Sequence, residues 1–89
     1  MIKDNELIKK YVESVEYSDS HDIEAVYTYC RLTLTNKYEL IGTSVCFNPV
    51  DYEDELGKYY AFSDALRSLY VIHDFLEQER RNKEQESGE

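Results

Sequence analysis

The sequence is short of the residues that build covalent or metal-bound frameworks. In 89 residues it holds two cysteines, two histidines, one proline, three glycines and no tryptophan. Two cysteines set no disulfide framework, and no cysteine and histidine lie at zinc-ligand spacing. If Asn36 and Lys37 form a hairpin turn, Cys30 and Cys46 point to opposite faces of the two strands, so we expect free thiols and no metal site.

Long apolar runs are also absent. No window approaches the roughly 18 apolar residues that a membrane span needs. The first ten residues, MIKDNELIKK, lack the apolar core and the small-residue cleavage site of a signal peptide. We therefore expect no membrane association and a cytoplasmic location.

Positive charge is scarce: ten Lys and Arg stand against 19 Asp and Glu, for a net charge of −9. Residues 1–25 carry three bases and seven acids, residues 26–47 two bases and one acid, and residues 48–89 five bases and eleven acids. Such a surface repels nucleic acid and anionic membranes, so we expect no direct nucleic-acid binding. It suits solubility alone, a basic protein partner or mimicry of DNA phosphates.

Motifs for catalysis are missing as well. The three glycines stand apart at 42, 57 and 88, so no glycine-rich loop can cradle a phosphate. Ser63, His73 and Asp74 have no nucleophile elbow around them, and His73 adjoins an apolar stripe typical of a core or interface histidine. We expect no catalytic residues, no cofactor and no enzyme activity.

Three segments carry the secondary-structure signal. Residues 4–17 place Ile8, Tyr11, Val12 and Val15 at helical spacing, which predicts a short N-terminal helix followed by a polar loop at 18–22. Residues 26–47 alternate with period two around Asn36-Lys37, which predicts a two-stranded antiparallel hairpin. On that register Leu32 pairs with Ile41, Thr28 with Val45 and Val26 with Phe47.

The last third of the chain is helical in pattern. From Leu56 to about Arg81 apolar residues recur at helical spacing, with Asp51 as a plausible N-cap. Gly42 in the strand and Gly57 in the helix indicate either close packing or a site. We expect one α+β domain at residues 1–81, consisting of a short N-terminal helix, the hairpin and the long helix, and a disordered acidic tail at 82–89.

A two-stranded hairpin is rarely stable alone in water. The long helix is expected to cover one face, and the open edges of the hairpin must be paired or shielded. Because the chain is also small, we expect a homo-oligomer, with edge-to-edge joining of hairpins as one solution.

The middle of the chain resembles a family of small tailed-phage proteins of the gene-49 and gene-66 type. The shared pattern is a Thr-x-Cys strand, an Asn turn, a Gly-x-Ser strand, a step into proline, an aromatic, and an acidic-Leu-Gly helix start with spaced alanines. It maps onto Thr28, Cys30, Asn36, Gly42, Ser44, Asn48, Pro49, Tyr52, Glu55, Leu56, Gly57, Ala61 and Ala65. Two departures are Lys37, where the family turn has Gly, and Asn48, where Asp is frequent. The resemblance implies phage or prophage origin, and so a host-cell cytoplasm, with no established activity.

Nine tyrosines are the marked excess of this sequence. Tyrosine is enriched at protein interfaces because it offers large contact area at low entropic cost. A small core and a self-association surface account for most of them on the reading that the sequence favours, and a recognition surface of tyrosines framed by carboxylates is the functional alternative. The candidate partner-binding residues combine tyrosines with charged neighbours, namely Tyr27, Tyr29, Arg31, Asp51, Glu53, Asp54, Tyr59 and Tyr60.

Two functional hypotheses of different class follow. By analogy with other small phage accessory proteins, the first is a protein that binds and inhibits a host defence protein, with a basic nucleic-acid-binding channel as one candidate target. The second is an oligomeric sponge for a signalling nucleotide, which needs cations such as Arg31, Lys58 and Arg67. A purely structural, self-associating role is a further alternative.

Overall fold

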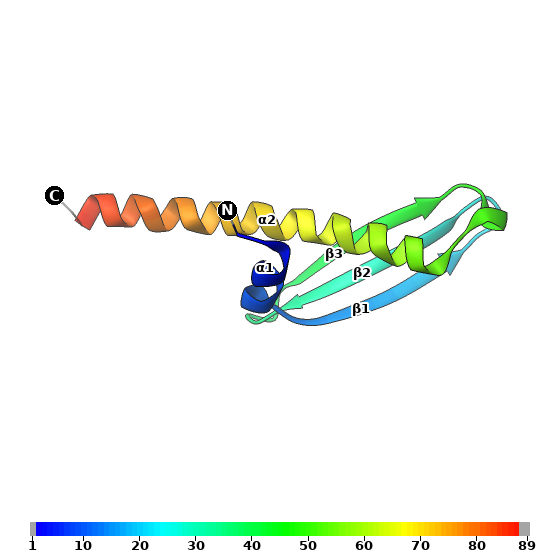
Figure 1. Cartoon of the computed structure of the whole chain (residues 1–89), viewed down its shortest axis with the longest axis horizontal. Coiled ribbons are helices and arrows are strands. Elements are labelled where there is room, and N and C mark those ends of the chain that lie inside the picture. Colours follow the sequence, from blue (N-terminus) through cyan, green and yellow to red (C-terminus); the bar gives the residue numbers. More distant parts are fainter. Residues whose placement is uncertain (1, 88–89) are drawn as a thin grey trace.

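The computed structural model describes residues 2–87, and the side chains of residues 2–84. In chain order its elements are α1 (Asp4–Tyr11), β1 (Val12–His21), β2 (Val26–Leu34), β3 (Glu39–Cys46), the 3-10 turn η1 (Pro49–Asp51) and α2 (Asp54–Ser87). The strands form one antiparallel sheet in the order β1-β2-β3, and α2 runs along one face of it (Figure 1). The expected α+β class is confirmed, with three strands in place of two. The molecule is elongated, measuring 62 × 20 × 19 Å.

The third strand replaces part of the predicted N-terminal helix. That helix ends at Tyr11, and the residues from Val12 onward pair with β2 up to His21 against Val26. The expected helix to residue 17 and loop at 18–22 were therefore wrong. Valine, tyrosine and serine favour strands and caps over helix interiors, and an open edge of β2 offers them a complete hydrogen-bond ladder.

The β2–β3 hairpin has a register one residue away from the predicted one. The loop holds three residues, Thr35 to Lys37, because Leu34 N–H donates to Tyr38 O at 2.8 Å and Lys37 takes a φ of 75°. Cys30 now lies opposite Gly42 and Val26 opposite Cys46. The predicted pairs were wrong, since a one-residue slip moves side chains to the other face.

The slip exchanges the two faces of β3. Leu40, Gly42 and Ser44 turn inward, whereas Ile41 and Val45 are exposed on the outer face. Cys46 also turns inward with Cys30, so the expected opposite orientation of the two sulfurs was wrong. Both cysteines are free, as expected.

The core lies between α2 and the inner face of the sheet, and α1 closes the hairpin-turn end. Its buried members are Leu7, Cys30, Leu32, Leu34, Ala61, Ala65, Leu66 and Leu69. The α1 helix is fixed to α2 by a hydrogen bond of 2.8 Å between Tyr11 Oη and Nδ1 of the buried His73. The expectation that His73 belongs to the core is confirmed.

Both glycines of interest serve packing. A Cβ on Gly42 would lie 2.0 Å from the backbone oxygen of Ala61 and 2.4 Å from the nitrogen of Ala65, so strand and helix backbones touch there. A Cβ on Gly57 would lie 2.5 Å from Oγ1 of Thr28. Helix α2 can lie flat on β3 only because position 42 has no side chain.

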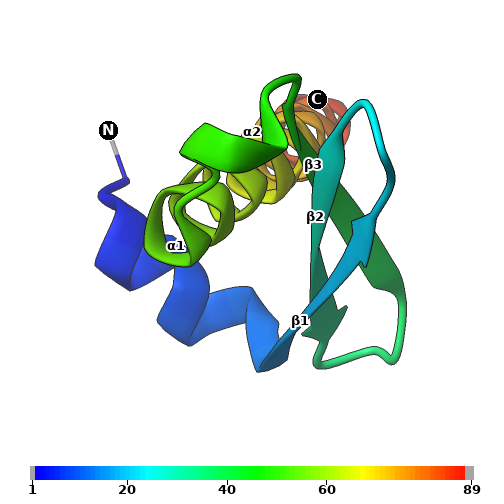
Figure 2. The same ribbon diagram turned by 90° about the vertical axis from the view of Figure 1, so that its right-hand side faces the viewer.

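The sheet leaves one face and two edges uncovered. Figure 2, which looks along the molecule, shows α1 and α2 on one side of the sheet and no helix on the other side. Along the open edge of β3 the Asp64 carboxylate accepts the Thr43 N–H at 2.9 Å. This side chain partly shields the edge from pairing with another strand.

Helix α2 begins at Asp54 and continues to Ser87, past the expected end near Arg81. Arg80 donates to Glu77 at 3.0 Å and to Glu84 at 3.1 Å, and such pairs support an exposed helix. Of the expected disordered tail at 82–89, residues 88–89 lie outside the described residues.

Candidate interaction surface at the acidic tip

Two connections meet at the end of the molecule that lies farthest from the C-terminus. They are the β1–β2 turn and the β3–α2 connection, seen at the right of Figure 1. We call residues 19–24 and 47–56 the acidic tip. It holds seven of the 19 acids and no Lys or Arg, and its acids are Asp19, Asp22, Glu24, Asp51, Glu53, Asp54 and Glu55.

Tyr52 joins the two halves of the tip. Its ring meets that of His21 edge to face, with centroids 5.6 Å apart. Its hydroxyl lies 3.2 Å from Oγ1 of the buried Thr28 and donates to Asp54 Oδ1 at 3.2 Å. One side chain thus connects the end of β1, the first part of β2 and the start of α2.

The β3–α2 connection is ordered by Asn48. Its side-chain oxygen accepts the Val50 N–H at 3.3 Å, and its amide donates to the Asp51 carboxylate at 2.6 Å. Pro49 occupies the first position of η1, where its missing N–H costs nothing. Asp51 therefore belongs to η1, and its predicted role as N-cap of the long helix was wrong.

One carboxylate of the tip is partly compensated. A hydrogen bond and ion pair from Lys58, at 3.0 Å, lowers the pKa of Asp54 from its ordinary value, and the Tyr52 hydroxyl acts in the same direction. Asp19 lies 2.6 Å from Nε2 of His21. Because residues 19–24 and 47–56 hold seven acids and no Lys or Arg, the tip keeps a negative potential.

The tip also exposes apolar side chains. Ile23 is 92 % exposed, Val50 91 % and Phe47 81 %. These are the three most exposed large apolar side chains of the described residues, and all three belong to the acidic tip. Apolar anchors within a charged rim are the usual anatomy of a protein-binding surface.

The predicted partner-binding residues do not form one surface. Asp51, Glu53 and Asp54 belong to the tip. Tyr27, Tyr29 and Arg31 belong to the strand face that points away from α2, where both tyrosines are half-buried.

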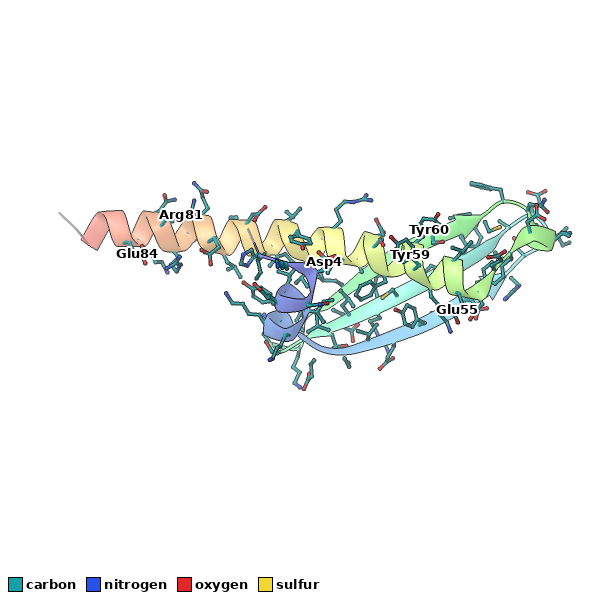
Figure 3. The ribbon with its side chains drawn as sticks, viewed as in Figure 1. Asp4, Glu55, Tyr59, Tyr60, Arg81 and Glu84 are labelled. Carbon is teal, nitrogen blue, oxygen red and sulfur yellow. The ribbon has the colours of Figure 1, made fainter. Side chains whose placement is uncertain are left out.

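The other two predicted tyrosines lie on α2. Tyr59 and Tyr60 are exposed on the helix and contact each other edge to face at 5.4 Å (Figure 3). We call the sheet face that points away from α2 the bare sheet face. The predicted residues are thus divided among the tip, the bare sheet face and the exposed side of α2.

The apolar members of the tip were missed. Ile23 follows the predicted loop at 18–22 and carried no prediction, and Phe47 was predicted to pair with Val26 on the apolar face of the hairpin. The available signal was the placement of apolar residues next to acids in turn sequences: Ile23 lies between Asp22 and Glu24, and Val50 precedes Asp51.

The cations proposed for a nucleotide site are separated and paired. Arg31 bonds to Glu16 on the outer sheet face, Lys58 to Asp54, and Arg67 lies 3.7 Å from Asp64. A hollow of about 400 Å³ adjoins Tyr29 and Arg31. Each of the three positive charges is already engaged by a carboxylate of the same chain.

The described side chains, those of residues 2–84, contain no group of three or more His, Cys, Asp or Glu placed to hold a metal ion. Within the same residues, no helix combines the length and apolar character needed to cross a bilayer.

Fold and surface together define a small α+β protein with an acidic, apolar-studded end. The chain belongs to the Phage protein (N4 Gp49/phage Sf6 gene 66) family, whose model matches residues 4–80. The match runs from α1 through most of α2 and includes the whole tip. No curated protein and no solved structure matches the chain. It is therefore a phage-encoded type of protein, and the family description names no activity.

Proposed function

We propose that this phage protein inhibits a host defence protein by binding it directly through the acidic tip. The observation that supports this most is the combination at one end of seven carboxylates, no Lys or Arg, and three apolar side chains that are more than 80 % exposed. Carboxylates steer a cationic partner into place and raise the association rate. Desolvated apolar anchors then supply most of the affinity.

The chemistry of the tip selects the partner. A protein surface with clustered Lys or Arg around an apolar recess complements it, and a nucleic-acid-binding channel is one such surface. If that channel is the target, nucleic acid and this protein compete for it. Binding weakens as salt rises, because screening shortens the range of the charge attraction.

Affinity capture from a lysate of the phage host tests the proposal. The wild-type protein is expected to retain a specific protein at about 0.1 M salt and to lose most of it at about 1 M, where the Debye length falls to about 3 Å. Phe47→Ala together with Val50→Ala is expected to weaken capture at least tenfold without changing the charge. Capture of no specific protein at either salt concentration contradicts the proposal.

A charge-matched pair of variants isolates the tip. Glu24→Gln with Glu53→Gln removes two charges from the tip, whereas Glu6→Gln with Glu39→Gln removes two charges from α1 and the start of β3. The first pair is expected to weaken capture and reduce its salt dependence, and the second to leave both near wild type. Equal effects of the two pairs on capture would show that capture depends on the net charge of the protein and not on where the charges lie.

A second candidate, the sponge for a signalling nucleotide, is supported by the hollow beside Tyr29 and Arg31. An aromatic ring and a guanidinium suit a base and a phosphate. A ligand-dependent rise in melting temperature during a nucleotide screen, lost in Arg31→Gln, is the expected result. A screen in which no nucleotide raises the melting temperature argues against it.

A further inference from the structure

The far half of α2 carries an apolar face that residues 2–84 leave largely exposed. Val71, Phe75 and Leu76 are exposed and Ile72 is half-buried, and their spacing places all four on one side of the helix. We call these four residues the projecting patch. Figure 1 shows α2 running on past the end of the sheet, and α1 contacts this part of the helix through the bond between Tyr11 and His73.

The projecting patch continues the core-facing stripe of α2. Ala61, Ala65 and Leu69 are fully buried, and Ile72 and Leu76 follow at spacings of three and four residues. The sheet ends before the stripe does. A helix is stabilised mainly by packing of its apolar face, so the unpacked continuation gains from a covering partner.

Charge separates the two ends of the molecule. The acidic tip has seven acids and no Lys or Arg, whereas residues 71–84 have four acids and three bases. Two copies with a net charge of −9 each repel one another. Contact through residues 71–84 brings together two segments in which acids and bases nearly balance. It also keeps the two acidic tips at opposite ends of the dimer, where salt screens them from each other.

We propose that two copies of this chain associate through the projecting patch. A two-fold axis brings the same four side chains of each copy together, and the two α2 helices cross with opposite directions. The occupant is a second copy rather than the host protein, because a cationic partner is drawn to the tip and not to the balanced segment. Both tips remain free to bind. The contact is small, so the dissociation constant is expected in the range of about 10–100 μM.

Sedimentation or light-scattering mass over about 5 μM to 1 mM tests the inference. Wild type is expected to shift from monomer to dimer over this range, and Phe75→Glu to weaken association at least 30-fold. Tyr59→Glu is the matched control, because Tyr59 is 63 % exposed and Phe75 61 % exposed on the same helix. It is expected to associate as wild type does. A wild-type protein that is monomeric at 1 mM, or a Phe75→Glu variant that still dimerises, overturns the inference.

Salt distinguishes this association from binding at the tip. Raising salt from about 0.05 to 0.5 M is expected to tighten self-association several-fold, because it screens repulsion between like charges. The same change weakens capture of a cationic partner. If Phe75→Glu instead abolishes capture while wild type is monomeric, the projecting patch belongs to the host protein and the dimer is contradicted, whereas the proposed binding of a host protein stands.

Discussion

Gly42 is the residue on which contact between α2 and the sheet depends most directly. The nearest atoms to an added Cβ belong to the helix backbone, 2.0 and 2.4 Å away, and backbone cannot rotate aside. Gly42→Ala is expected to lower the free energy of unfolding by about 3 kcal/mol, at the upper end of overpacking costs. Urea unfolding followed by circular dichroism measures it.

Gly57→Ala is the comparison for Gly42→Ala. Its added Cβ meets a side-chain atom, Oγ1 of Thr28, and alanine favours a helix by about 1 kcal/mol over glycine. Its cost is therefore expected to be smaller than that of Gly42→Ala. Equal stabilities for Gly42→Ala and wild type would contradict the backbone contact.

Asp54 gives a prediction about pH. Its pKa is lowered in the folded protein, chiefly by the hydrogen bond from Lys58. The stabilising effect of its charged form is present above the unfolded-state pKa and is lost as pH falls through the folded-state pKa. A carboxyl-detected NMR titration is expected to show the midpoint of Asp54 moving up in Lys58→Gln. An unchanged midpoint would exclude Lys58 as the cause.

Among the elements, the hairpin turn shows how one backbone conformation sets a register. Lys37 holds a φ of 75°, a region that costs a non-glycine residue about 1–2 kcal/mol. Lys37→Gly relieves this backbone cost and loses the exposed ion pair with Glu13. The difference is expected to raise the free energy of unfolding by about 0.5–1 kcal/mol. Lys37→Gln isolates the ion pair and is expected to give no gain. Destabilisation by the glycine variant would contradict this reading of the turn.

Elements whose apolar residues repeat at one spacing along their whole length were predictable from the sequence. The alternation from Val26 predicted β2, and helical spacing after Leu56 predicted α2. Strand β1 was missed because Ile8 and Val12 keep helical spacing across the boundary at Tyr11, so local pattern favours helix until pairing with β2 is considered. The register of β3 was missed because it depends on whether the loop has two or three residues, which Asn36-Lys37 does not specify.

The surfaces were less predictable than the elements. The acids of the tip were visible in the sequence, but the tip joins residues 19–24 to residues 47–56, which only the sheet brings together. Ile23 is exposed because it lies in the turn between β1 and β2. Phe47 is exposed because it follows the end of β3 and the corrected register turns it outward. Tyr27 and Tyr59 were grouped by residue type, and folding sends them to different surfaces.

At the scale of the whole molecule, charge and apolar surface are distributed along a 62 Å axis. One end is acidic with exposed apolar side chains, and toward the other end residues 71–84, with four acids and three bases, carry an exposed apolar helix face. The proposed binding of a cationic partner and the proposed self-association therefore use different parts of the molecule. It predicts opposite salt dependences for the two processes within one chain.

Hydrogen exchange of the protein with and without its captured partner tests the central claim most directly. The account predicts new protection at residues 19–24 and 47–56, where the tip is covered, with little change at residues 27–33 and 39–45 of the bare sheet face. Protection confined to the bare sheet face, with exchange at the tip unchanged, would contradict it.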